Sequence, residues 1–185
     1  MSQFSFLPFK NLSSERLLLR QITPADVSEV FAMRSNEDIM KYVPRPLCKT
    51  LDEAIALMNM IQQKIETNEG INWAITLKGS DTMIGFIGHY RIQWENFRSE
   101  VGYMLSPDFQ GQGIATEAVH LVTEYGFKEM KMHSLEAIID PDNIASAKVL
   151  EKSKFVKEAH FKENEFYDGK FLDSVVYSLL EKYLK

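Results

Sequence analysis

The sequence predicts a mixed α/β (α+β) domain built around a largely antiparallel sheet, with the element order βααβββαβαββ. Three observations lead to this class. Strand-like runs follow one another directly in the middle of the chain, between residues 71 and 106. Helix-like runs with apolar residues at helical spacing precede and follow this block. The 185 residues contain no repeat, low-complexity tract or Pro/Gly/Ser-rich linker, so a single domain over 1–185 is expected.

The first part of the chain is expected to form one strand and two helices. Residues 16–22 (RLLLRQI) form the strand, and the first helix begins after Thr23 as its N-cap. The second helix follows the loop 44–49, starts with a capping box at Thr50 and ends at Gly70. Its apolar face, which is expected to pack in the core, consists of Ile55, Met58, Ile61 and Ile65.

The remaining elements complete the predicted order. The three successive strands are 71–78, 82–92 and 99–106. They are followed by a helix at 113–130, a strand at 134–140, a helix at 143–153 and a terminal pair of strands at 155–169 and 171–184. The pair turns at Asp168 and Gly169.

Composition narrows the function classes. The formal net charge is −5, which disfavours bulk binding to nucleic acid or to an anionic membrane and is compatible with a cationic substrate. Cys48 is the single cysteine, so it forms no internal disulfide and no cysteine-based metal site, and we expect a free thiol and no metal. The N-terminus lacks the pattern of a secretory signal, and no window approaches the ~20 apolar residues of a membrane span. A cytoplasmic protein is expected.

The stretch SPDFQGQGIATEA, residues 106–118, carries the strongest chemical signal. Gly111 and Gly113 lie between a predicted strand and a predicted helix, where unpaired N–H groups and the helix dipole favour an anion such as a phosphate. No Gly-Lys-Ser/Thr follows, so the loop is not a P-loop, and the antiparallel context argues against a dinucleotide fold. A tight turn without a ligand is the alternative.

Three features of the chain resemble one known family. Gln110-x-x-Gly113-x-Ala115 matches the Gln/Arg-x-x-Gly-x-Gly/Ala signature of the GCN5-related N-acetyltransferases (GNAT). Residues 140–155 (DPDNIASAKVLEKSKF) resemble the Asn-x-x-Ser segment of that family, and the element order agrees over about 13–183. The stretches SSERLLLRQITPADV and VGYMLSPDFQGQGIATEAV look like the branch of the Rim-type ribosomal-protein N-terminal acetyltransferases.

The resemblance implies a GNAT-like, strongly twisted and mostly antiparallel sheet with helices on both faces. It also implies acetyl-CoA as co-substrate, with the pyrophosphate on the glycine loop and the pantetheine arm in a gap beside residues 99–106. Backbone amides around Met104 and Leu105 would bind the oxyanion. The cofactor-binding residues expected from it are Met104, Leu105, Gln110, Gly111, Gln112, Gly113, Ile114, Ala115, Thr116, Asn143 and Ser146.

The acceptor implied by the branch is a primary amine, and the expected substrate is a protein N-terminus. A small amine, such as a polyamine or an aminoglycoside-like compound, is the alternative within the enzyme class. A sensor that binds acyl-CoA without turnover is the alternative outside it. The loops 36–50 and 162–172 would shape the acceptor site, and a homodimer through the last strand pair is possible.

An amine that attacks a thioester directly needs a base to take its proton, whereas the departing thiolate needs at most a weak acid. Glu100 is the expected base, His89 is its rival, and a water relay is a third route. Many relatives carry a tyrosine where this chain has Leu150, so Ser146 is the substitute acid unless water protonates the thiolate. Asn143 either anchors the pantetheine or caps the following helix.

One further departure from the family pattern and the positions of three aromatic residues lead to structural expectations. Lys154 stands where relatives often have a glycine, which predicts strain or a different helix cap. Trp73 is expected in the core, whereas Trp94 and Phe97, in a polar loop, are candidates for a substrate wall or an interface.

Overall fold

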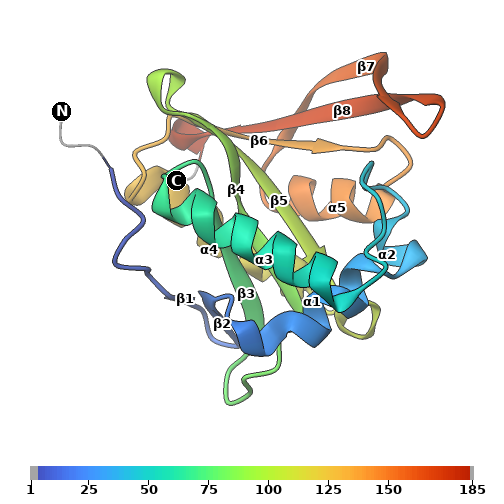
Figure 1. Cartoon of the computed structure of the whole chain (residues 1–185). Coiled ribbons are helices and arrows are strands. Elements are labelled where there is room, and N and C mark those ends of the chain that lie inside the picture. The colour runs from blue at the N-terminus through green and yellow to red at the C-terminus, as the bar shows by residue number, and fades with distance from the viewer. Residues whose placement is uncertain (1–3, 184–185) are drawn as a thin grey trace.

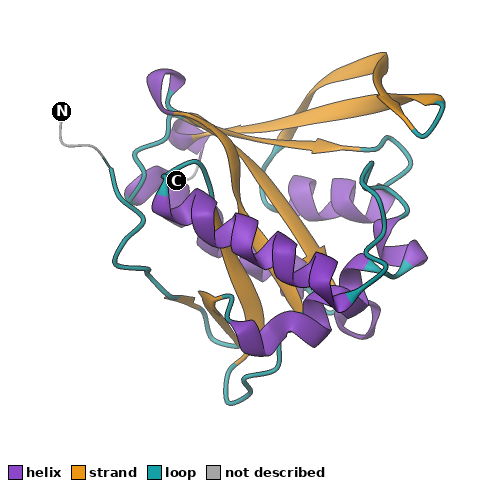
Figure 2. Cartoon of the chain, in the orientation of Figure 1, coloured by secondary structure: helices purple, strands orange, loops and turns teal. Residues whose placement is uncertain are grey.

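A single eight-stranded sheet runs through the computed structural model, which describes residues 4–183 (Figures 1 and 2). The strands are β1 (Leu12–Ser13), β2 (Leu17–Gln21), β3 (Ile71–Leu77), β4 (Gly85–Gln93), β5 (Arg98–Leu105), β6 (Ser134–Ile139), β7 (Val156–Tyr167) and β8 (Lys170–Leu180). Their order across the sheet is β1-β2-β3-β4-β5-β6-β8-β7. Only the β5–β6 pair is parallel among these neighbours.

Helices cover both faces of the sheet. They are α1 (Val27–Arg34), α2 (Glu37–Met40), α3 (Leu51–Glu66), α4 (Ile114–Lys128) and α5 (Ile144–Lys152). In Figure 1, α3 crosses in front of the central strands and α4 lies behind them. The expected caps of α3 and α5 are present, because the Thr50 side chain accepts from Glu53 N–H and the Asn143 side chain accepts from Ser146 N–H.

The mixed, mostly antiparallel fold is confirmed, with two local differences from the expected order. The two-residue strand β1 precedes the first predicted strand. The first predicted helix forms as a 3₁₀ turn at Pro24–Asp26 followed by α1, and the short helix α2 after it was not predicted. The extra helix begins at Asn36, whose side chain accepts from Ile39 N–H and so caps it. Residue 184 of the last predicted strand lies outside the described residues.

Two apolar clusters pack against the sheet, and α3 contributes to both, with Ile61 and Ile65 in the larger one and Ala54 in the smaller one. The larger cluster contains the apolar side of α4 and includes Trp73, which is fully buried as expected. The smaller cluster packs α1, α2 and α3 against the other face, where Met104 of β5 is a member. Since side chains alternate along a strand, Glu100 and Gly102 share the face of Met104, whereas Val101 and Leu105 face the larger cluster.

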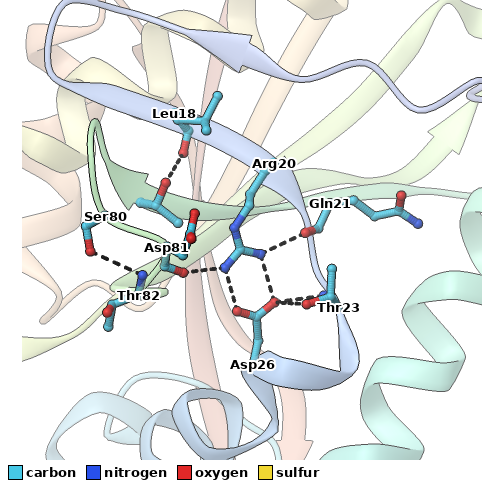
Figure 3. A network of polar contacts seen from close by, with 9 residues as sticks. Leu18, Arg20, Gln21, Thr23, Asp26, Ser80, Asp81 and Thr82 are labelled. Carbon is cyan, nitrogen blue, oxygen red and sulfur yellow. Dashed lines mark hydrogen bonds and ion pairs between the residues drawn. The ribbon is translucent and has the colours of Figure 1, made fainter.

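A buried ion pair holds the start of α1 against the sheet (Figure 3). The guanidinium of Arg20 on β2 makes two hydrogen bonds to the Asp26 carboxylate, at 2.9 and 2.6 Å. It also donates to the Asp81 carbonyl oxygen at 2.6 Å. The network therefore ties β2 to the first turn after it and to the loop that leads into β4.

The central strands separate at one point, which positions the site. β5 pairs with β6 only over Arg98–Glu100 and Ser134–Glu136. Beyond Glu100, β5 stays paired only with β4, as far as Leu105, and β6 stays paired only with β8, as far as Ile139. Figure 2 shows the two strands diverging into a fork. The expected separation of β5 from its neighbour is thus present in the fold.

Candidate active site

The glycine loop places a set of free N–H groups at the start of α4. Gly111 and Gly113 have φ values of +73° and +79°, a left-handed conformation that glycine adopts without strain. Gly113 is the N-cap of α4. The backbone N–H groups of 111–116 donate to no other described residue, as expected for a loop followed by the first turn of a helix. The arrangement can bind an anion.

A cavity of about 560 Å³ lies between this loop, the end of β5 and the start of α5. It is lined by ten of the expected cofactor-binding residues: Met104, Leu105, Gln110, Gly111, Gly113, Ile114, Ala115, Thr116, Asn143 and Ser146. Gln112 does not line it; its side-chain amide donates to the Asp108 carbonyl oxygen. The fold therefore brings the sequence-predicted set together from β5, α4 and α5.

The register of β5 decides which amides face the fork. Ser106 N–H donates to the Ile84 carbonyl oxygen at 2.8 Å, next to the facing residues Gly85 and Leu105. Because N–H groups alternate along a strand, the Met104 amide points to β4, and the Tyr103 and Leu105 amides point away from it, into the fork. The expected oxyanion role of the Met104 amide is therefore wrong, although Met104 lines the cavity. The Gln110 side chain donates to the Leu105 carbonyl oxygen at 3.1 Å and holds the strand end in place.

Glu100 lies at the apex of the fork, as the last residue of β5 that pairs with β6. Its side chain is 16% exposed, and Arg91 Nη1 lies 3.0 Å from Oε2. That oxygen is nevertheless buried and accepts no hydrogen bond from a described residue. Burial raises the pKa of Glu100, Arg91 opposes this shift, and the nearby Glu136 carboxylate adds to it. A carboxylate of this kind can accept a proton.

A second cavity of about 360 Å³ adjoins the first on the side of α2. The loop after α2, the end of β6 and the β7–β8 hairpin line it, and Tyr42 and Val43 line both cavities among the described residues. Arg45 of the loop and Glu165 of β7 lie 3.7 Å apart across it. Both charges act on the pKa of Glu100, which itself lines neither cavity.

His89 is not available as a base, so the rival assignment is wrong. Its imidazole is fully buried, with Nδ1 3.0 Å from Ser99 Oγ and Nε2 2.9 Å from the Val122 carbonyl oxygen. Burial lowers the pKa of His89 to about 4, so the ring is neutral at physiological pH. Nε2–H then donates to Val122, and the imidazole is a structural link between β4 and α4.

The start of α5 carries the remaining expected residues. Asn143 uses its side-chain oxygen as the cap of α5, which leaves its amide N–H groups for another partner. Tyr103, which sequence reasoning missed, lines the cavity and donates to the Ser146 carbonyl oxygen at 3.4 Å. Leu150, at the position of the family tyrosine, is fully buried in the core.

Two other expectations have clear outcomes. Lys154 has a φ of +67°, so the predicted strain at the end of α5 is confirmed. Trp94 does not line either cavity: its ring packs on Phe4 and Phe6 and its Nε1–H donates to the Asn68 carbonyl oxygen. Phe97 is half exposed in the β4–β5 turn.

The residues around the first cavity fit acetyl-CoA. Free amides at the start of α4 match a pyrophosphate, and the fork leaves strand amides for an extended amide-bearing arm. Lys148 and Lys152 add positive charge to the same cavity. Within residues 4–183, no group of three or more His, Cys, Asp or Glu side chains could hold a metal ion. No helix in that range is long and apolar enough to cross a membrane.

Comparison with known proteins agrees with this geometry. A family model described as an acetyltransferase (GNAT) domain matches residues 16–156. A Bacillus subtilis protein named "Uncharacterized N-acetyltransferase YoaA" is 30% identical over 94% of this chain and 98% of its own length. The spermidine N(1)-acetyltransferase of Vibrio cholerae is 24% identical over 92% of this chain and 97% of its own length.

Solved structures show the same fold. A GNAT-family acetyltransferase from Bacillus anthracis is 29% identical and superposes with a TM-score of 0.84 over 94% of this chain and 99% of that chain. RimL, a ribosomal L7/L12 alpha-N-protein acetyltransferase solved with coenzyme A, gives a TM-score of 0.84 at 19% identity over 92% and 98% of the two chains.

The chain therefore belongs to the GNAT family. It is an acetyl-CoA-dependent N-acetyltransferase whose acceptor is an amine.

Proposed function

We propose that this acetyltransferase acts on the primary amine of a protein N-terminus, by direct attack with Glu100 as the base. One observation carries the proposal: Glu100 lies at the apex of the β5–β6 fork, with the cofactor cavity beside β5 and a second cavity on the side of α2. Bound acetyl-CoA supplies the thioester whose acetyl group is transferred.

Each residue around the fork has a role in this mechanism. The amides of the glycine loop and the first turn of α4 bind the pyrophosphate. The free strand amides of Tyr103 and Leu105 stabilise negative charge on the acetyl oxygen. The Glu100 carboxylate, whose Oε2 accepts no hydrogen bond from a described residue, takes the proton of the attacking ammonium or amine, directly or through one water. Ser146 Oγ, at the start of α5, is the proposed donor to the departing sulfur.

The second cavity is the proposed acceptor site. It lies between the two segments expected from the sequence, 36–50 and 162–172, and shares Tyr42 with the cofactor cavity. Its lining holds more carboxylates than cations: five carboxylates (Glu37, Asp140, Glu165, Asp168 and Asp173) and three cations (Lys41, Arg45 and Lys170). A net negative lining attracts an ammonium group, which a peptide N-terminus and a polyamine both carry, and the resemblance to the Rim-type branch favours the N-terminus. A small amine is the alternative acceptor, because one of the relatives is named a spermidine N(1)-acetyltransferase.

The experiment is thiol release from acetyl-CoA with a panel of N-terminal peptides, polyamines and aminoglycosides, with mass spectrometry to locate the acetyl group. The expected result is peptide-dependent release and an acetylated α-amine. Release with polyamines alone would overturn the acceptor assignment. Tight acetyl-CoA binding without release on any amine would favour the sensor.

The role of Glu100 needs its own comparison. Glu100→Gln keeps the size of the side chain and removes its ability to accept a proton. The variant is expected to bind acetyl-CoA as the wild type does and to lose amine-dependent release. Unchanged release in Glu100→Gln would leave the acetyltransferase in place and reject this base.

A further inference from the structure

The β4–β5 hairpin contains a bulge directly opposite the apex of the fork. The pairing of β4 with β5 is regular from Gly85 to Tyr90 and resumes only at Gln93. Within the bulge, Arg91 has a φ of +44°, a left-handed conformation that costs a residue with a Cβ atom free energy. Bulges often redirect one side chain near a functional site.

The bulge directs Arg91 toward Glu100. Its Nη1 atom lies 3.0 Å from Glu100 Oε2, and Tyr90, the neighbour of Arg91, faces Glu100 in register. The contact is an ion pair without hydrogen-bond geometry, because Oε2 accepts no hydrogen bond. Arg91 is mostly exposed, at 57%, whereas Glu100 is mostly buried, so the guanidinium can move aside without unfolding the strand.

The other charges that act on the pKa of Glu100 are Glu136, Arg45 and Glu165, and each has an ion-pair partner of its own. Glu136 on β6 is held by Arg98 at 2.6 Å, and Arg45 of the loop after α2 is paired with Glu165 of β7. The phenol of Tyr90 is neutral, since burial raises its pKa to about 12. Arg34 of α1 acts on Tyr90 and has a buried Nε without a partner. Arg91 is therefore the cation that directly offsets the Glu100 carboxylate among the described residues.

We propose that Arg91 is a positioning residue that keeps Glu100 ionised and yields the Oε2 atom to the incoming amine. The inference rests on the proposed role of Glu100 as the base. A buried carboxylate without a cation would take up a proton near neutral pH and lose its function as a base. A hydrogen-bonded arginine would instead occupy the oxygen that the amine needs. The bulge allows a close ion pair without a hydrogen bond to Oε2, so the amine has to displace only an exposed guanidinium.

The pH dependence of kcat/KM tests the proposal. Arg91→Gln removes the charge, so the pKa of Glu100 rises and the acidic limb of the profile moves up by about 1 pH unit. Arg91→Lys keeps a cation and is expected to move the limb by less. Lys10→Gln removes one charge from a distant surface pair with Glu129 and is expected to leave the limb in place. An unmoved limb in active Arg91→Gln would overturn the proposal.

A measurement that needs no turnover separates this proposal from the proposed function. The Glu100 carboxyl can be titrated by carbon NMR in the wild type and in Arg91→Gln, with Glu100→Gln to assign its signal. The expected result is a higher pKa in Arg91→Gln, whether or not an acceptor is known. An equal pKa in both proteins would reject the ion pair even if the enzyme is active.

Stability tests the claim that the bulge is strained for function. Arg91→Gly and Arg91→Ala both remove the guanidinium, and only the glycine also removes the Cβ at a φ of +44°, so Arg91→Gly is expected to have a Tm about 2 °C above that of Arg91→Ala. A Tm in Arg91→Gly equal to or below that of Arg91→Ala would contradict the claim that the bulge stores strain.

Discussion

Replacement of Gly111 by alanine tests the glycine loop with a matched control. Gly111 has a φ of +73°, and no heavy atom lies within 4 Å of the position that a Cβ would take. Alanine therefore meets no clash, and its cost is the backbone penalty of the left-handed region, about 1–2 kcal/mol. Gly79, in the β3–β4 turn, has a φ of +84° and is equally open. Gly79→Ala should lower the free energy of unfolding by the same amount.

The two variants should differ in coenzyme A affinity. The N–H of Gly111 belongs to the free amides of the anion site, and a methyl group there would hold a phosphate away from the backbone. Gly111→Ala is expected to raise the Kd for coenzyme A at least tenfold, equivalent to about 1.4 kcal/mol, and Gly79→Ala to leave it unchanged. Calorimetric titration with coenzyme A and urea unfolding measure the two quantities. Equal Kd values in Gly111→Ala and Gly79→Ala would refute the reasoning.

Three further results are expected. The acidic limb of kcat/KM should have its midpoint above the ordinary pKa of a glutamate, because burial raises the pKa of Glu100, and Glu100→Gln should abolish it; a limb that survives in a residually active Glu100→Gln would assign it to another group. Asp26→Asn should lower the free energy of unfolding by about 3 kcal/mol at pH 7 in urea, because it removes the charge partner of buried Arg20. In the fold, burial alone would raise the pKa of Asp26, but the hydrogen bonds from Arg20 and Thr23 hold it below its usual value, so the difference should shrink as the pH falls through the unfolded pKa of Asp26 and below it. A difference that does not change with pH would count against this cause. Protonation of His89 should lower the free energy of unfolding by about 3 kcal/mol between pH 7 and pH 4, because the pKa of His89 is about 4 in the fold and about 6.5 in the unfolded chain, which therefore binds the proton first. His89→Gln should flatten this part of the pH profile of unfolding, and an unchanged slope would show that other groups cause it.

Local sequence signals predicted the elements and most of the cavity. The caps at Thr50 and Asn143 and the loop that contains Gly111 and Gly113 depend on contacts within a few residues, so the sequence is enough to place them. Residues that follow the loop directly, such as Ala115 and Thr116, reach the cavity for the same reason.

Features that depend on pairing between distant segments were not predictable from one sequence. The burial of His89 follows from its position opposite α4, where the Val122 carbonyl oxygen accepts a hydrogen bond from its ring, and the histidine itself gives no sign of this. Tyr103 was missed because only the register of β5 shows which amides face the fork. Arg91 was missed because a bulge changes the alternation of side chains without a glycine or proline to mark it.

The most direct test of the account is amide hydrogen exchange, resolved by residue, at Tyr103, Met104 and Leu105 with and without acetyl-CoA. The account predicts fast exchange at Tyr103 and Leu105 in the free protein, since their amides face the open fork, and slow exchange at Met104, whose amide pairs with β4. Acetyl-CoA should slow exchange at one or both of the fork amides and leave Met104 unchanged. Equal protection of Tyr103 and Leu105 in both states, with acetyl-CoA bound, would contradict the claim that the fork receives the acetyl-bearing arm.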